Sequence, residues 1–332
     1  MVVLMVAVCL AALAGSASSA HAVRARKVRV VTVVKVRGIA WFDRMQQGIA
    51  RFAARTGVDA RMVGAANSSP RSQVLLIRRV LAERPRPDAI TVVPNSPASL
   101  EAVLKHARAI GVKVVTHEAS NQRNTDVDIE AFPNPAYGAH LMDNLASCMG
   151  GSGTYVAFVG HKSAQSHMEW VRGASAEARR RYPQIKRIGG SIESLEHADV
   201  AYRKAKQLLR RYPDLKGFEG SSAVDVAGIG RAVREAGRQK STCVIGTSTP
   251  ATVGTYLNDG SVDKISFWDP ALAGEAQDAL ALRLIYGRRI GPGLDLHLPG
   301  YRNLKRIPGS PHGLAGAGWI DVTKANASKY PF

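Results

Sequence analysis

The sequence contains few cysteines, few aromatic residues and far fewer acidic than basic residues. Only three of its 332 residues are Cys, and Phe, Trp and Tyr together make up 6%. Three cysteines are too few for a scaffold built on disulfides. Cys9 lies in the apolar N-terminal segment, whereas Cys148 and Cys243 could pair in an oxidising compartment, a question that the sequence alone leaves open.

The sequence also lacks a convincing catalytic, nucleotide-binding or metal-binding motif. It has no P-loop, and the glycine-rich stretch at 228–233 lies within a helical pattern and not after a strand, as a dinucleotide fingerprint requires. His161 and His167 have no carboxylate or cysteine nearby that would complete a metal set. Glu118 with His117 could act as an acid/base pair, but no nucleophile or oxyanion device accompanies them. We therefore expect no enzyme, no metal and no cofactor.

Positive charge is abundant, since 45 Lys and Arg stand against 26 Asp and Glu, a net charge of +19. The cations are spread along helical faces, for example at 179–181 and 210–211, without a helix-turn-helix, zinc or base-stacking signature. This distribution favours a solvated basic surface, which could attract anionic membranes or acidic partners. We expect no nucleic-acid partner.

Residues 1–22 have the pattern of a secretory signal peptide. The apolar core from Val2 to Ala14 is shorter than the ~20 residues of a membrane-spanning helix. Ala20-His21-Ala22 fits the small-x-small rule for cleavage. We therefore expect export and a periplasmic location.

From residue 28 onward, short β-branched runs alternate with amphipathic segments, which is typical of βα units around a parallel sheet. The alternation restarts near residue 153, so the chain has two similar halves. The predicted strands lie near 28–35, 58–63, 88–93, 112–116, 127–129, 153–159, 186–190, 216–219, 242–246 and 263–267. The predicted helices lie near 42–55, 70–83, 97–110, 135–148, 167–181, 197–211, 223–236, 250–258 and 270–286. The sequence predicts an α/β fold with two doubly wound parallel-sheet lobes.

No low-complexity linker separates the halves, so we expect a hinge of several short strands between the lobes. The Gly/Pro-rich stretch after the last helix is too irregular for another βα unit and fits a final crossover. The expected N-terminal lobe comprises residues 23–118 plus about 270–296. The expected C-terminal lobe comprises residues 119–269 plus about 297–332.

Polar residues follow many of the predicted strands, at the sheet edge where open parallel sheets bind their ligands. They are Lys35 and Arg37, Asn95 and Ser96, His117 and Glu118, Ser221 and Ser222, Thr247 and Ser248, and Asp269. Trp41 and Phe42 follow Lys35, and a cation beside flat aromatic faces suits a small, hydroxyl-rich molecule. Each such residue singly is more often a helix cap or a solvated turn. Their repetition predicts a binding cleft between the lobes.

The order of motifs resembles that of the periplasmic sugar-binding proteins of ABC importers, type I fold, and in particular the branch of autoinducer-2-binding and rhamnose-binding proteins. The resemblance covers nearly the whole chain after residue 22. Its supporting segments are VVKVRGIAWF (33–42), AITVVPNSPASLEAVLKHARAIGVKVVTHEAS (89–120), VAFVGHKSAQSHMEWV (156–171), CVIGTSTPATVGTYLNDGSV (243–262), FWDPALAGEA (267–276) and NASKYPF (326–332).

This resemblance implies a set of ligand-binding residues: Lys35, Trp41, Phe42, Glu118, Ser166, His167, Ser221, Ala223 and Asp269. Lys35 matches a lysine that binds ligand hydroxyls, and Trp41 and Phe42 match the aromatic wall. Ser221 stands in the place of a proline whose carbonyl contacts the ligand. Ala223 agrees with the branch, and Asp269 matches a carboxylate at the second crossing between the lobes.

Three positions depart from the branch. Glu118 stands where the branch has an aspartate, so the carboxylate is kept but reaches one methylene further. Ser166 and His167 replace an Asp-Gln pair, which removes a negative charge. Because an unmatched buried hydroxyl costs about 1 to 3 kcal/mol, these changes argue against autoinducer-2 itself and leave a pentose, a deoxyhexose or a polyol.

The implied protein is an exported solute receptor that binds one small polyhydroxylated ligand between its lobes and delivers it to the permease of an ABC transporter. An autoinducer-2-type signal receptor is an alternative, as is a sensory protein that engages a chemoreceptor or sensor kinase. Sugar-responsive repressors have the same lobes, but they need an N-terminal DNA-reading helix pair, where this chain has an apolar segment.

Overall fold

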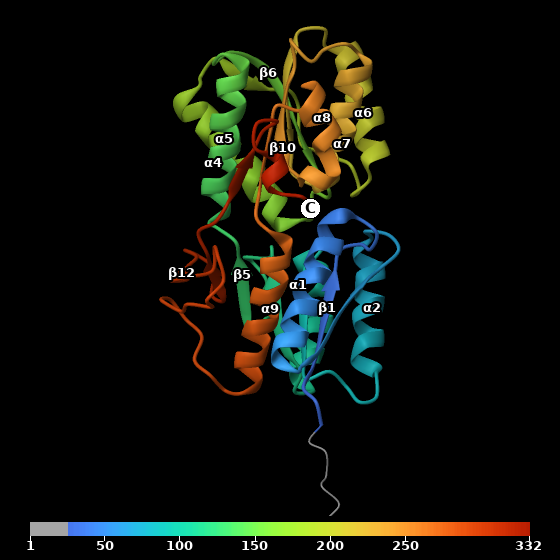
Figure 1. The fold of residues 1–332 in the computed structure, drawn as a ribbon, viewed down its shortest axis with the longest axis vertical. Coiled ribbons are helices and arrows are strands. Elements are labelled where there is room, and N and C mark those ends of the chain that lie inside the picture. The colour runs from blue at the N-terminus through green and yellow to red at the C-terminus, as the bar shows by residue number, and fades with distance from the viewer. Residues whose placement is uncertain (1–25) are drawn as a thin grey trace, which may run out of the picture.

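The computed structural model describes residues 26–332, so the expected signal peptide lies outside the described residues. Two lobes lie end to end, and each is a twisted sheet with helices on both faces (Figure 1). The predicted fold class is confirmed, because nearly all neighbouring strands of both sheets are parallel. Within residues 26–332, no helix has the length and apolarity needed to span a membrane.

The N-terminal lobe has a seven-stranded sheet in the order β12-β13-β5-β4-β3-β1-β2. Its strands are β1 (Arg29–Val34), β2 (Asp59–Gly64), β3 (Ala89–Val92), β4 (Lys113–His117), β5 (Val127–Glu130), β12 (Lys305–Arg306) and β13 (Gly313–Ala315). Its helices are α1 (Ala40–Thr56), α2 (Pro70–Ala82), α3 (Pro97–Ala109) and α9 (Pro270–Ile285).

β1 shows why this lobe folds as a doubly wound sheet. Successive side chains of a strand point to opposite faces. Val31 and Val33 join an apolar cluster with α2 and α3, whereas Val30 and Val34 join a second cluster that includes Ile49 of α1. Because helices cover both faces, β1 is an almost continuous apolar run. The run ends at the sheet edge that faces the other lobe.

The C-terminal lobe has a sheet in the order β14-β11-β10-β9-β6-β7, and β8 also pairs with β6. Its strands are β6 (Gly153–Val159), β7 (Ile185–Arg187), β8 (Ile192–Glu193), β9 (Leu215–Gly220), β10 (Cys243–Thr247), β11 (Lys264–Phe267) and β14 (Ile320–Val322). Its helices are α4 (Asn134–Met149), α5 (Gln165–Arg181), α6 (Ala198–Arg211), α7 (Ala223–Glu235), α8 (Pro250–Asp259) and the 3-10 helix η1 (Ala327–Lys329). Figure 1 shows α4 and α5 on one face and α6, α7 and α8 on the other.

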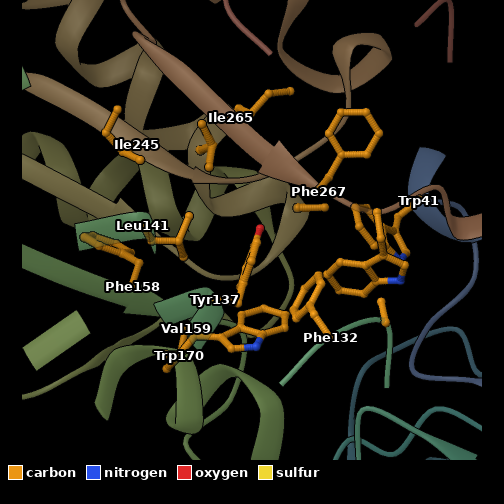
Figure 2. Packing of buried hydrophobic residues seen from close by; sticks show 14 of the residues in the cluster. Trp41, Phe132, Tyr137, Leu141, Phe158, Val159, Trp170, Ile245, Ile265 and Phe267 are labelled. Atoms are coloured by element: carbon orange, nitrogen blue, oxygen red, sulfur yellow. The ribbon is translucent and has the colours of Figure 1, made fainter. Parts of the chain in front are cut away.

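Aromatic rings fill the core of the C-terminal lobe where it approaches the N-terminal lobe. The rings of Phe132 and Tyr137 stack with centroids 4.1 Å apart, and Trp170 meets Tyr137 edge-on at 5.2 Å (Figure 2). Such pairs add to the free energy gained from burying the rings. A disulfide between Cys148 and Cys243 joins the end of α4 to the start of β10, which answers the question that the sequence left open.

The chain crosses between the lobes three times, at residues 131–133, 268–269 and 316–319. The expected lobe boundaries at 119 and 297 therefore differ from the observed sheet membership. β5 follows residue 119 but pairs with β4, and residues 305–315 return to the N-terminal sheet as β12 and β13. A two-residue and a three-residue strand leave too little pattern in a Gly/Pro-rich stretch to be predicted, and β13 is held by its pairing with β5.

Candidate functional site

A narrow cavity lies between the lobes, with about 300 Å³ of space that includes the open solvent at its mouth. The N-terminal lobe supplies Lys35, Ile39, Trp41, Phe42 and Glu118 to its wall. The C-terminal lobe supplies His167, Trp170, Glu196, Ser221, Ser222, Ala223 and Thr247, and Trp268 comes from the second crossing. Both lobes thus contribute side chains to one space between them.

Lys35 follows the last residue of β1 and is buried at the edge of the cavity. Its Nζ lies 2.6 Å from Oε2 of Glu118, which follows β4. Burial lowers the pKa of Lys35, but the negative charges of Glu118, Glu196 and Glu130 and the hydrogen bond to Glu118 together leave the pKa above its ordinary value. The side-chain amide of Asn95 donates to the Lys35 carbonyl at 2.9 Å and fixes the backbone there. Lys35 is therefore a charged, oriented donor.

Glu118 connects the two lobes. Its Oε2 also accepts a hydrogen bond from Ser166 Oγ of α5, at 3.0 Å. Burial raises the pKa of Glu118, but the electrostatic attraction of Lys35, His117 and His167 and the hydrogen bond from Lys35 together lower it to about 2. Glu118 is one of the few non-glycine residues with a positive φ, 61°, a backbone conformation that recurs at functional sites. The carboxylate is thus ionised and held by groups from both lobes.

His167, on the first turn of α5, contributes a neutral imidazole. Its Nδ1 accepts a hydrogen bond from the Gly160 N–H at 3.1 Å, and its Nε2 lies 3.5 Å from Lys35 Nζ. Burial and the nearby charge of Lys35 hold the pKa of His167 well below its ordinary value. With Nδ1 as the acceptor, the neutral ring carries its proton on Nε2, which makes His167 a second donor at the cavity.

Aromatic rings form the apolar wall. Trp41 and Trp268 meet edge to face with ring centroids 4.7 Å apart. Trp268 also meets Trp170 edge to face, with ring centroids 5.7 Å apart. Phe42 lies beside Trp41 on the first turn of α1. A flat apolar wall opposite charged groups can cover the C–H face of a sugar while the polar side binds its hydroxyls.

The turn between β9 and α7 closes the cavity from the C-terminal lobe. Ser222 caps α7 in a capping box with Asp225, so its side chain has a structural task as well. Ser221 is buried, and its Oγ has no hydrogen-bond partner among the described residues. Buried hydroxyls are normally bonded, so Ser221 leaves a hydrogen-bonding position open in the wall.

Seven of the nine residues predicted to bind ligand line this cavity: Lys35, Trp41, Phe42, Glu118, His167, Ser221 and Ala223. Ser166 is not in the wall but bonds to Glu118. Asp269 lies at the predicted second crossing but outside the cavity. It caps α9 through the Ala271 N–H and forms a bidentate ion pair with Arg44, with distances of 2.9 and 2.7 Å.

Sequence reasoning missed Ile39, Trp170, Glu196 and Trp268 as residues of the wall, whereas Thr247 was among the polar residues expected at the strand ends. Trp268 had a signal, because it lies directly after β11. Glu196 had none, since it follows a two-residue strand in an irregular stretch. It is 5% exposed, and its Oε2 accepts a hydrogen bond from Ser222.

A family model described as a periplasmic binding protein domain matches residues 30–289. The chain belongs to this family. The predicted resemblance is thereby confirmed at the level of the family. Because the match begins in β1 and ends just after α9, it spans both lobes of this periplasmic binding protein.

Solved structures share the fold of this periplasmic binding protein at low sequence identity. LsrB from Clostridium saccharobutylicum in complex with AI-2 is 19% identical, with a TM-score of 0.84, over 92% of this chain and 100% of that one. An ABC transporter solute-binding protein from Clostridium phytofermentas with bound L-rhamnose is 16% identical, with a TM-score of 0.83, over 92% and 98%. Another, from Agrobacterium vitis with bound α-D-tagatopyranose, is 21% identical, with a TM-score of 0.79, over 91% and 96%.

Proposed function

We propose that this protein is an exported receptor for a small sugar or polyol, which it delivers to the permease of an ABC transporter. The observation that carries the proposal is the cavity between the lobes, where the Lys35–Glu118 ion pair faces a wall formed by Trp41 and Trp268. Sugars combine hydroxyl rims with apolar C–H faces, so this pairing of surfaces matches them. Membership of the periplasmic binding protein family supports the same role.

Hydrogen bonds between the lobes support a mechanism based on closure. Ser120 Oγ donates to Glu169 at 2.9 Å, and Ser68 Oγ donates to the Leu195 carbonyl at 2.8 Å. A ligand that contacts both walls binds the closed arrangement better than an open one. That difference in affinity shifts the hinge equilibrium toward closure. In the proposed function, the permease recognises the closed form.

Within this proposal the predicted residues have distinct tasks. Lys35 and His167 donate to ligand oxygens, Glu118 accepts from hydroxyls, and Trp41 and Phe42 cover the apolar face of the ligand. Ser221 and Ala223 close the opposite side. Ser166 orients Glu118, whereas Asp269 holds Arg44 at the second crossing and acts on the hinge.

The ligand class rests on the polar groups of the cavity and on what the fold neighbours bind. The named structures contain AI-2, L-rhamnose and α-D-tagatopyranose, all small molecules rich in oxygen. Ser166 supplies a hydroxyl where the related branch has a carboxylate, which favours a pentose, a deoxyhexose or a polyol over AI-2. We propose a receptor and not an enzyme, because no hydroxyl in the described cavity wall bonds to a histidine that could activate it as a nucleophile.

A thermal-shift screen of the chain from Val23 onward tests the function. The panel contains pentoses, hexoses, deoxysugars, polyols and AI-2, and each hit is followed by calorimetry and by mass analysis of the recovered sugar. A ligand at a hundred times its Kd stabilises the folded protein by about 2.7 kcal/mol, which raises Tm measurably. A hit that is recovered unchanged supports a receptor. A chemically altered sugar would reject the receptor function in favour of an enzyme. If no compound of the panel raises the Tm of the folded protein, the sugar class is rejected.

A further inference from the structure

Glu196 brings an incompletely bonded carboxylate into the wall of the cavity. Its Oε2 accepts from Ser222, but its Oε1 has no hydrogen-bond partner among the described residues. The side chain is buried, and a buried carboxylate oxygen without a donor is costly. The unpartnered Ser221 hydroxyl belongs to the same wall. These two atoms mark the positions where a ligand would complete the hydrogen bonding.

The backbone at Glu196 is strained in the same way as at the other carboxylate of the cavity. Five non-glycine residues within 26–332 have a positive φ, and they include Glu118 at 61° and Glu196 at 58°. Leu195, just before Glu196, has a φ of 59°. Such conformations cost free energy and persist where the surrounding structure holds a residue for a task. Both carboxylates of the cavity are thus held in place by uncommon backbone geometry.

The charges in the cavity do not balance. Lys35 neutralises Glu118, whereas no Lys, Arg or His of residues 26–332 forms an ion pair with Glu196. Burial lowers the pKa of both His167 and the nearby His161, so neither ring supplies a positive charge at neutral pH. A site removed from water that holds one uncompensated carboxylate disfavours a second negative charge.

We propose that Glu196 is a specificity-determining residue, whose Oε1 accepts a hydrogen bond from a hydroxyl or protonated amine of the ligand and excludes acidic sugars. This inference rests on the proposed sugar-receptor function and narrows its ligand class to neutral or amine-bearing polyhydroxylated molecules. Glu196 reaches the cavity from the turn between β8 and α6.

The first test compares wild type with Glu196→Gln, which keeps the shape and removes the charge. Calorimetry measures Kd for L-rhamnose, D-arabinose, D-tagatose, D-galactose, D-galactosamine and D-galacturonate. In wild type we expect galacturonate to bind at least about tenfold more weakly than galactose, and galactosamine to bind at least as well as galactose. A hydrogen bond to a charged group corresponds to about a tenfold to hundredfold change in Kd. Glu196→Gln should therefore raise the Kd of each sugar that binds by this factor. It should also remove any tighter binding of galactosamine relative to galactose.

The outcomes separate the two proposals. If neutral sugars bind wild type but galacturonate binds equally well, or if Glu196→Gln leaves every Kd unchanged, the role of Glu196 is wrong and the receptor function stands. If none of the sugars binds folded wild type, the sugar-receptor function fails and the specificity inference fails with it.

A second variant moves the carboxylate without removing it. A Cβ on Gly160 would overlap the Glu196 carboxylate, which must then swing away at the end of its flexible side chain. We expect Gly160→Ala to reproduce the affinity loss of Glu196→Gln. Gly254→Ala is the matched control, because its Cβ would meet no atom within 4 Å. Wild-type affinity in a folded Gly160→Ala protein would overturn the proposal, and if that variant does not fold, Glu196→Gln decides alone.

Discussion

Replacing Lys35 with alanine should weaken closure of the lobes far more than it weakens the folded state. Lys35 and Glu118 both belong to the N-terminal lobe and lie at its edge, so in an open protein both would be hydrated. In the closed structure both are buried, at 3% and 4% exposure. The substitution therefore leaves Glu118 as an unpaired charge only when the lobes are closed.

The magnitude follows from the difference between these two states. Removing one partner of a buried ion pair costs about 3 to 5 kcal/mol, whereas removing one partner of an exposed pair costs about 0 to 1 kcal/mol. The closed form should thus lose about 3 kcal/mol relative to the open form, which lowers ligand affinity by roughly a hundredfold or more. Loss of the direct contact between Lys35 and the ligand adds to this effect.

Two measurements check the prediction. Calorimetry with the best sugar of the screen gives the affinity, and small-angle X-ray scattering with and without that sugar reports closure. The Tm of the ligand-free protein should change little. Lys35→Met combined with Glu118→Gln removes both charges, so the double variant should close again even if it binds sugar weakly. A fall of many degrees in the ligand-free Tm of Lys35→Ala, or a double variant that stays open, would refute the reasoning.

Three further predictions concern other parts of the molecule. Trp41→Leu should reduce sugar affinity and diminish the ligand-induced change in tryptophan emission, to which Trp170 and Trp268 also contribute, and an unchanged emission response would exclude Trp41 from the stacking wall. Burial raises the pKa of Asp278 to about 8, so this carboxyl keeps its proton in the folded state and contributes stability that is lost as pH rises from about 4 to 8. In that range the unfolding free energy of wild type should fall more steeply with pH than that of Asp278→Asn, by about 1.4 kcal/mol per pH unit. Denaturant unfolding at several pH values measures both slopes. Cys148→Ser with Cys243→Ser should lower the unfolding free energy by about 2 to 5 kcal/mol, because the disulfide spans 95 residues, and dithiothreitol should have the same effect on wild type but none on the double variant.

Much of the architecture could be predicted because strands buried on both faces leave a clear signature. β1 is almost entirely apolar, and the residue that follows it, Lys35, had to lie at the edge of a parallel sheet. The same logic placed Glu118 after β4 and Ser221 after β9. Position along a strand thus carried most of the information about which residues meet between the lobes.

The remaining features depend on tertiary structure. β13 has three residues and is a strand only because β5 lies beside it. Glu196 reaches the cavity because Leu195 and Glu196 both have left-handed backbone conformations. Neither Leu nor Glu is a residue type from which that conformation could be predicted. At the second crossing the carboxylate of Asp269 was expected to face the ligand, but it caps α9, and the neighbouring Trp268 lines the cavity instead.

The return of the chain to its first sheet has a consequence for the order of folding. β5 is held between β4 and β13, and β13 comes from residues 313–315, far along the chain from β5. During synthesis, the N-terminal sheet therefore exposes the free edge of β5 until residues 313–315 have emerged. Unpaired edges are templates for pairing with other chains. Residues 313–315 thus close a sheet that began to form from residue 29, and protein shortened before residue 313 would be prone to associate through that edge.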